Sequence, residues 1–334
     1  MKYRSLGKTG FEVSEIGFGA WQLGQTGWTD TSEESAKKAL HAALDTGVNL
    51  IDTAAGYGGG KSERLVAQVM AERGVTPGQG QGSDRVVIVT KTPPAPGAWP
   101  PSPHDNINDR YSPEYIRTNV EERLRNLNTE CLDVLLLHSW TRVWNRNPSV
   151  FETLAALKRE GKLHSVGVST PEHDQNSVIG LMRAGLVDAV EVIYNIFEQE
   201  PIAELLPVAE ETGTGIIVRV VLDEGVLAGK FNEDTTFPED DVRSRYFAGD
   251  RMVRAVRRTR AVEKEVASEG ERLPDAAVKF ALAQAAVSTV IIGTGKPEHA
   301  RDNSAISDAP GLSPGLLEKL HEHAWRRGFW YGGK

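Results

Sequence analysis

Four side chains that can move protons follow short apolar segments in the first half of the sequence. Asp52 and Tyr57 come after one such segment, and Lys91 and His138 each come after another. A carboxylate, a phenol, an ammonium and an imidazole together provide the groups for general acid–base catalysis. Lys91 is costly to bury without a counter-ion, so we expect it to pair with Asp52. A cation beside Tyr57 would favour the phenolate and lower its pKa from about 10.

Each of these residues also has a purely structural interpretation. Asp52 can cap a loop, Lys91 can carry its charge to solvent, and His138 can be a hydrogen-bonded core histidine. For any one of them alone, the structural interpretation is the more common one. The combination favours a site, because the carboxyl ends of the strands in a parallel barrel converge on one mouth.

Eight apolar segments alternate with helical patterns, which predicts a closed (β/α)8 barrel, or TIM barrel, as one domain over residues 1–334. The predicted strands cover residues 16–20, 48–53, 86–90, 132–137, 165–169, 189–194, 215–222 and 290–293. A doubly wound open sheet is the alternative architecture. Against it, Gly17-Phe18-Gly19-Ala20-Trp21-Gln22 does not match the dinucleotide-binding pattern G-x-G-x-x-G.

Start and stop signals place a hairpin and helices around these strands. A β-hairpin over residues 3–14 is predicted to turn at Lys8-Thr9-Gly10. Helices are predicted to cover residues 62–73 and 201–212 and to begin at Thr31-x-x-Glu34, Ser112-Pro113, Asn147-Pro148 and Thr170-Pro171. Two connections, residues 92–111 and 223–250, exceed the usual loop length, and we expect them on the carboxyl-terminal face as binding loops or lids.

Aromatic residues gather in the first long connection and at a few later positions. The group comprises Trp99, His104, Tyr111, Trp140, Trp144 and Phe329-Trp330-Tyr331. An aromatic rim around the barrel mouth would suit sugars, ring ketones or other bulky substrates with an apolar face. Ordinary core packing of these rings is the equal alternative.

Composition limits the classes of partner. The 334 residues are 40% apolar and 25% charged, with a formal net charge of −8, which argues against a nucleic-acid or membrane surface. The one cysteine, Cys131, excludes an internal disulfide and is expected to be a buried structural thiol. The first residues lack a signal-peptide core, and no segment is long and apolar enough to span a membrane, so a cytoplasmic location is expected.

Two common kinds of catalytic site are missing from the sequence. There is no H-E-x-x-H pattern, the eight histidines are dispersed, and no metal site is predicted. There is also no G-x-S-x-G nucleophile elbow. The acid–base residues therefore need a hydrolytic water or a cofactor. Residues 291–298 run from a strand through glycines to a helix start, where free amides and Lys296 would suit a phosphate.

Taken in order, the patterns resemble those of the aldo-keto reductases over essentially the full length of the chain. The matching segments are Gly17-x-Gly19 with Trp21, Ile51-Asp52-Thr53-Ala54-x-x-Tyr57-Gly58, Thr90-Lys91, Leu136-Leu137-His138, Gly167-Val168-Ser169, Gly225-x-Leu227-x-Gly229-Lys230, and Gly293-Thr294 through Pro297-Glu298 to Asn303. The resemblance implies a (β/α)8 barrel that binds NADP(H), or less often NAD(H), and interconverts carbonyls and alcohols.

The resemblance also implies roles for individual residues. Tyr57 would be the general acid and base, Lys91 with Asp52 would tune its pKa, and His138 would orient the carbonyl. Substrate contacts would come from Trp21, Tyr57, Trp99 and His138. Cofactor contacts would come from Trp21, Ser169, Thr170, Glu191, Arg219, Leu222, Gly225, Gly293, Thr294, Lys296 and Asn303.

Several of these positions depart from the family pattern. Ser169-Thr170 stands where many relatives have Ser-Asn, and Glu191 stands where glutamine is usual. Arg219 replaces a tyrosine that stacks on the nicotinamide, and its charge is expected to favour the reduced, uncharged ring. His299 stands where some relatives have an arginine for the 2′-phosphate, so a preference for NADP(H) depends on Lys296 and Arg301.

Three functions remain open from the sequence. The first is an NADP(H)-dependent oxidoreductase acting on a small-molecule carbonyl or alcohol, as a monomer or homo-oligomer. The second is a non-catalytic, cofactor-binding regulatory subunit. The third is a barrel hydrolase, which would need a second acid opposite Asp52.

Overall fold

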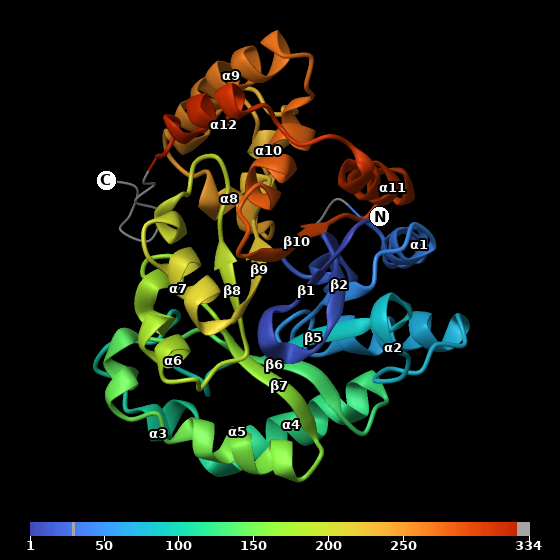
Figure 1. Cartoon of the computed structure of the whole chain (residues 1–334), viewed down its shortest axis with the longest axis vertical. Coiled ribbons are helices and arrows are strands. Elements are labelled where there is room, and N and C mark those ends of the chain that lie inside the picture. The colour runs from blue at the N-terminus through green and yellow to red at the C-terminus, as the bar shows by residue number, and fades with distance from the viewer. Residues whose placement is uncertain (29–30, 326–334) are drawn as a thin grey trace.

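The computed structural model describes residues 1–28 and 31–325. Eight parallel strands form a closed barrel in the order β10-β3-β4-β5-β6-β7-β8-β9, which confirms the predicted (β/α)8 architecture (Figure 1). The strands are β3 Ile16–Gly19, β4 Leu50–Asp52, β5 Val87–Thr92, β6 Leu132–His138, β7 Leu163–Ser169, β8 Ala189–Ile193, β9 Gly215–Arg219 and β10 Val287–Gly293.

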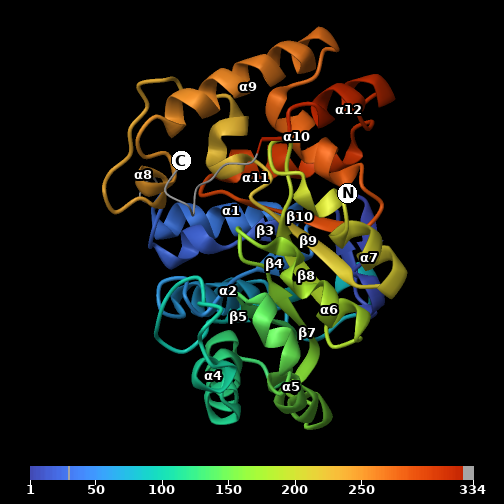
Figure 2. The ribbon, with the colours of Figure 1, turned by 90° about the vertical axis from the view of Figure 1, so that its left-hand side faces the viewer.

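Helices surround the barrel on its outside, as two views at right angles show (Figure 1, Figure 2). They are α1 Glu33–Asp45, α2 Lys61–Glu72, α3 Ile107–Arg110, α4 Pro113–Leu127, α5 Val150–Arg159, α6 Ile179–Arg183, α7 Leu205–Thr212, α8 Val242–Tyr246, α9 Arg251–Ser268, α10 Leu273–Leu282, α11 Pro297–Ala305 and α12 Pro314–His321. Within the described residues, no helix is long and apolar enough to cross a membrane.

The barrel interior is filled by side chains that alternate along each strand. One buried cluster joins inward-facing residues of six strands, namely Leu50, Val87, Val89, Val134, Leu136, Ala189, Ile217 and Ile291. The residues between them face the helices and belong to a separate, larger cluster. Because successive strand residues point to opposite sides, the residue two positions beyond an inward apolar side chain also points inward.

The predicted N-terminal hairpin closes the amino-terminal end of the barrel. It pairs β1 Tyr3–Ser5 with β2 Glu12–Ser14, and Gly10 turns the chain with φ of 82°. Leu6, Phe11 and Val13 pack into the interior cluster.

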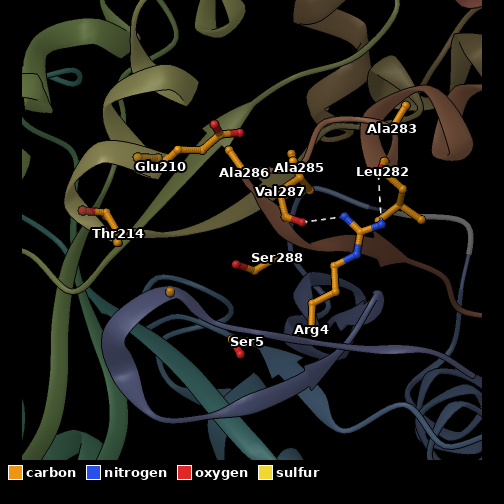
Figure 3. A pocket seen from close by; sticks show the side chains of 13 residues that line it. Arg4, Ser5, Glu210, Thr214, Leu282, Ala283, Ala285, Ala286, Val287 and Ser288 are labelled. Atoms are coloured by element: carbon orange, nitrogen blue, oxygen red, sulfur yellow. Dashed lines mark hydrogen bonds between the residues drawn. The ribbon is translucent and has the colours of Figure 1, made fainter.

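A groove of about 510 Å³ lies beside this hairpin (Figure 3). It is lined by Arg4 and Ser5, by the end of α10 and by Val287 and Ser288 at the start of β10. The Arg4 guanidinium is held by the carbonyl oxygens of Leu282 and Val287 (Figure 3) and by Glu15. The groove is therefore at the end of the barrel opposite to the predicted site, and none of the predicted site residues lines it.

Several predicted helix starts were wrong by a short distance. Ser32, rather than Thr31, caps α1, because the Ser32 hydroxyl accepts the Ser35 amide while Thr31 bonds to Gly295. Helix α4 does begin at Pro113 after the Ser112 cap, as predicted. Helix α5 begins at Val150, two residues after the predicted start.

Two larger differences concern the carboxyl-terminal face. No α-helix begins at Thr170-Pro171, because the Thr170 hydroxyl and amide both bond to the Glu191 carbonyl oxygen, and the next helical residues are Gln175–Val178. Strand β9 ends at Arg219 rather than at residue 222. Val220 has φ of 57°, a region that β-branched residues rarely adopt, and this turns the chain out of the sheet.

The predicted aromatic rim is largely wrong. Tyr111, Trp140 and Trp144 are fully buried and pack on one another, so they belong to the core. Trp99 is 51% exposed and His104 is also exposed, so only these two stay open to solvent among the described residues of the group. Phe329, Trp330 and Tyr331 lie outside the described residues. The single cysteine, Cys131, is half-buried rather than buried.

Candidate active site

Alternation along the strands places one polar layer directly above the apolar interior cluster. Each polar residue lies two positions beyond an inward-facing residue of its strand. Five pairs begin in this cluster: Leu50 and Asp52, Val89 and Lys91, Leu136 and His138, Ala189 and Glu191, and Ile217 and Arg219. In the sixth pair, Ser169 follows Gly167, where an added Cβ would meet the Leu136 side chain. The six side chains therefore share the carboxyl-terminal mouth of the barrel, where barrel enzymes carry their sites.

A fully buried ion pair confirms the predicted contact between Lys91 and Asp52. The Lys91 ammonium donates to both Asp52 carboxylate oxygens at 2.6 Å and to the Thr53 carbonyl oxygen at 3.1 Å. A second carboxylate, Glu191, lies 3.2 Å from the same ammonium. The exposed fractions of the Lys91, Asp52 and Glu191 side chains are 0, 2 and 1%.

The three charges perturb one another strongly because they are buried, where solvent screens charges poorly. Burial, and then the nearby Glu191 carboxylate, raise the pKa of Asp52 well above its ordinary value, although Lys91 opposes the change. Burial alone would raise the pKa of Glu191 too, but Lys91 and Arg219 lower it. Burial would lower the pKa of Lys91, but Asp52 and Glu191 raise it, so Lys91 stays charged.

Tyr57 lies in the loop after β4, beside this cluster. The Lys91 nitrogen is 5.2 Å from the centroid of the Tyr57 ring, and Trp21 stacks on that ring at 5.5 Å with an interplanar angle of 12°. Burial, opposed by Lys91 and reinforced by Asp52 and Glu191, raises the pKa of Tyr57 above its ordinary value. The predicted lowering of this pKa is therefore wrong, because burial and two carboxylates outweigh one ammonium. Tyr57 holds its proton at neutral pH.

Gly58 fixes the loop that presents Tyr57. Its φ is 65°, and a Cβ added there would lie 2.2 Å from the Gly24 carbonyl oxygen. The glycine thus allows the Tyr57 loop to lie against the loop that follows β3.

We expect Gly58→Ala to destabilise the protein by about 2 kcal/mol or more, since the positive φ alone costs about 1–2 kcal/mol. Turnover should fall as well, because the Tyr57 ring would shift. Urea unfolding and steady-state rates would measure both effects. Gly56→Ala is the control in the same loop, since nothing lies within 4 Å of a Cβ there. Equal losses in the two variants would contradict the role given to Gly58.

His138 faces the same space as Tyr57, with ring centroids 6.4 Å apart and the rings edge to face. Burial, and then Lys91, lower the pKa of His138 to about 3. The imidazole is therefore neutral at neutral pH, so it can serve as a hydrogen-bonding group rather than as an acid. Trp99 lies edge-on to His138 at 5.1 Å, which places this exposed ring beside the predicted substrate position.

Ser169, Glu191 and Arg219 form the other side of the mouth. The Ser169 hydroxyl donates to a Glu191 oxygen at 2.9 Å, and the Arg219 Nε lies 3.5 Å from the same oxygen. Arg219 also donates to the Thr170 carbonyl oxygen and lies 3.7 Å from Glu172. Two carboxylates thus offset the Arg219 charge. A preference for the reduced cofactor would require an unopposed charge, so Arg219 alone does not support it.

Basic groups converge at the start of α11, where a phosphate was predicted. Helix α11 has no side-chain cap at its N-terminus, so its first amides are open to an anion. The Lys230 nitrogen lies 3.5 Å from a His299 ring nitrogen, and burial, Lys230 and Lys296 lower the pKa of His299. Gly293 is exposed at the end of β10. These groups fit the phosphates of a dinucleotide.

The remaining predicted cofactor residues lie around this region. Thr294 is buried with its hydroxyl turned to the Lys296 amide, and Asn303 is half-buried on α11. Leu222 and Gly225 are half-buried in the turns after β9, where Gly225 has φ of 95°. Arg301 is exposed on α11. Within the described part of the chain, no group of three or more His, Cys, Asp or Glu could hold a metal ion.

The second long connection lies close to Trp21, through contacts that the sequence did not reveal. The Arg243 guanidinium, on α8, stacks on Trp28 at 4.3 Å and on Phe237 at 4.5 Å. Trp28 in turn lies edge-on to Trp21 at 6.0 Å. Residues more than 200 positions apart therefore meet beside Trp21, and no local pattern in the sequence indicates such a contact.

This chain is similar to a known protein family over most of its length. A model of the Aldo/keto reductase family matches residues 15–324. Aldo-keto reductase YhdN of Bacillus subtilis (strain 168) is 31% identical over 244 residues, which are 73% of this chain and 69% of that protein. The NADH-specific methylglyoxal reductase of Escherichia coli (strain K12) is 27% identical over 317 residues, covering 91% of this chain and 93% of that protein.

A solved structure is similar over the same extent. The glycerol dehydrogenase AKR11B4 from Gluconobacter oxydans is 27% identical in sequence and has a TM-score of 0.74. The match covers 93% of this chain and 91% of that chain.

Proposed function

Because the chain belongs to the aldo/keto reductase family, we propose that it is an NADP(H)-dependent oxidoreductase that interconverts a carbonyl and an alcohol. The observation that carries the proposal is the convergence of Asp52, Tyr57, Lys91 and His138 at one mouth. Proteins of this family use nicotinamide cofactors, and its named relatives include reductases and dehydrogenases. When bound, the cofactor supplies or accepts the hydride.

The side chains of the site transfer the proton, orient the carbonyl and bind the substrate. In reduction, Tyr57 gives its proton to the carbonyl oxygen, and in oxidation it takes a proton from the hydroxyl group. Neutral His138 donates a hydrogen bond to the same oxygen and orients it. Lys91 places a positive charge beside the phenol and stabilises the phenolate that forms. Trp21, beside Tyr57, and Trp99, beside His138, would contact the substrate.

We also propose which residues bind the two ends of the cofactor. Ser169, Thr170, Glu191 and Arg219 would hold the nicotinamide end. Gly293, Thr294, Lys296 and Asn303 would hold the adenosine end, with Leu222 and Gly225 in the connection that follows β9. The basic groups at α11 favour NADP(H), because a 2′-phosphate adds negative charge there.

We expect Lys296→Ala to weaken NADPH binding about ten- to a hundredfold, as expected for a lost charge-assisted hydrogen bond. NADH binding should change little, because NADH has no 2′-phosphate. Fluorescence titration of both cofactors measures the two dissociation constants. Arg301→Ala tests the alternative phosphate contact on α11. A parallel loss of NADH affinity would show that Lys296 does not select between the cofactors.

A panel of aldehydes, ketones, keto-sugars and the matching alcohols would test the function. Each compound is assayed with NADPH and with NADH, and turnover is followed at the nicotinamide absorbance. We expect multiple turnovers with at least one carbonyl and a higher kcat/KM with NADPH. Activity that needs no nicotinamide would refute the proposal and favour hydrolysis.

We also propose that the substrate is a small molecule and that the protein is cytoplasmic. The single cysteine supports the cytoplasmic location, because disulfides are rare in that compartment.

A regulatory subunit is the second candidate. One relative, 27% identical over 340 residues, is the probable voltage-gated potassium channel subunit beta of Arabidopsis thaliana. Oxidation of one equivalent of bound NADPH without further turnover would favour this candidate over the enzyme.

A further inference from the structure

We propose that Asp52 and Glu191 form a carboxyl–carboxylate pair that holds one proton between them and jointly serves as the counter-ion of Lys91. Glu191 is thus a positioning residue that acts on Tyr57 through Lys91. The expected effect of Glu191 on turnover rests on the proposed function. The shared proton does not depend on the proposed function.

The geometry places both carboxyl groups on one ammonium. Lys91 has three N–H donors, and they reach Asp52 at 2.6 Å and the Thr53 carbonyl oxygen at 3.1 Å. The Glu191 Oε2 lies 3.2 Å from the same nitrogen. One carboxyl group from β4 and one from β8 therefore face the same Lys91 nitrogen. All three side chains are at most 2% exposed.

The titratable and charged groups that face this pair come from three strands and two loops. They are Lys91 on β5, His138 on β6, Arg219 on β9, Tyr57 in the loop after β4 and Glu172 in the loop after β7. His138 and Tyr57 are uncharged at neutral pH. Arg219 is 20% exposed and lies between Glu191 and the 19% exposed Glu172, so its charge is divided between two carboxylates.

Around this pair, the three carboxylates of Asp52, Glu191 and Glu172 face the two cations of Lys91 and Arg219, which leaves one excess negative charge. Two close, buried carboxyl groups cannot readily ionise together, so one of them keeps a proton. A proton shared in this way also explains how the buried Glu191 is tolerated on the same ammonium as Asp52. Removing either carboxyl group should ionise the other, and Lys91 keeps its counter-ion.

The pair predicts an unusual pattern of variants. Asp52→Asn and Glu191→Gln should each keep Lys91 charged. Each should lower turnover by less than about tenfold, well below the roughly hundredfold or more of a lost general acid or base. The double variant leaves Lys91 without a counter-ion. Its turnover should fall at least about tenfold below the product of the two single effects, as for directly coupled residues.

Infrared difference spectroscopy at neutral pH detects the shared proton without any assay of activity. The wild-type protein should show the C=O band of a buried carboxylic acid, and this band should vanish in Asp52→Asn and equally in Glu191→Gln. A band that persists in either single variant, or that is missing from the wild type, would overturn the shared proton. Wild-type protein that shows the band but turns over no carbonyl would refute the proposed function alone.

Glu63→Gln is the matched control. Glu63 is equally buried, but it pairs with Arg123 and Thr90 outside the barrel interior. In combination with Asp52→Asn, its effect on turnover should be a simple product of the single effects. If Glu191→Gln behaved in the same multiplicative way, Glu191 would not be a counter-ion of Lys91.

Discussion

Tyr57→Phe is expected to lower kcat about a thousandfold or more, within the range of a lost general acid. The phenyl ring keeps the stacking contact with Trp21 at 5.5 Å but has no proton to give. Cofactor affinity should therefore stay within about threefold of wild type, since only the hydroxyl is lost. Stopped-flow hydride transfer and fluorescence titration measure the two quantities separately.

A matched control uses another buried tyrosine. Tyr194→Phe removes a hydroxyl from the core, where the ring packs on Phe280 at 5.5 Å, away from the site. That variant should keep its turnover. If Tyr57→Phe retained wild-type kcat, the proton donor would have to be another group.

The largest expected loss of stability follows from Lys91→Met. The change leaves buried Asp52 without a cation and leaves Glu191 only the partly exposed Arg219. Removing one partner of a buried pair costs about 3–5 kcal/mol. Turnover should also fall strongly, because the phenolate of Tyr57 loses its stabilising charge. Urea unfolding gives the change in the free energy of unfolding.

Two further variants separate the loss of charge pairing from the loss of packing as causes of the instability. Lys279→Met removes a lysine that pairs with the partly exposed Glu271 at 2.7 Å outside the site, so it should cost only about 1 kcal/mol. The triple variant of Lys91→Met with Asp52→Asn and Glu191→Gln should regain stability, because neutral side chains replace the buried charges. A triple variant as unstable as Lys91→Met would show that packing, not charge, causes the loss.

The barrel and the Asp52–Lys91 pair could be predicted because both depend on local patterns. Apolar runs of strand length between helical patterns define the strands, and a lysine after such a run requires a partner. The third member of the cluster could not be predicted in the same way. Contact between Glu191 and Lys91 depends on how β5 and β8 face each other across the closed barrel, which only the strand tilt and register determine.

Other differences have equally physical causes. The pKa of Tyr57 depends on how deeply the hydroxyl lies, and a sequence shows the nearby charges but not the burial that outweighs them. Thr170 is a residue type that often caps helices, but its hydroxyl donates a hydrogen bond to the Glu191 carbonyl oxygen on the neighbouring strand. The contact of Arg243 with Trp28 joins two loops that are distant in the sequence.

The stacking of Trp21 on Tyr57 also gives the protein an optical reporter. Indole emission responds to the aromatic and charged groups beside the ring, and Trp21 has Tyr57 on one face and Trp28 at its edge. Trp140 and Trp144 are enclosed in the core and should contribute a constant background. Intrinsic fluorescence can therefore follow the filling of this mouth directly, in unlabelled protein and with ligands that undergo no reaction.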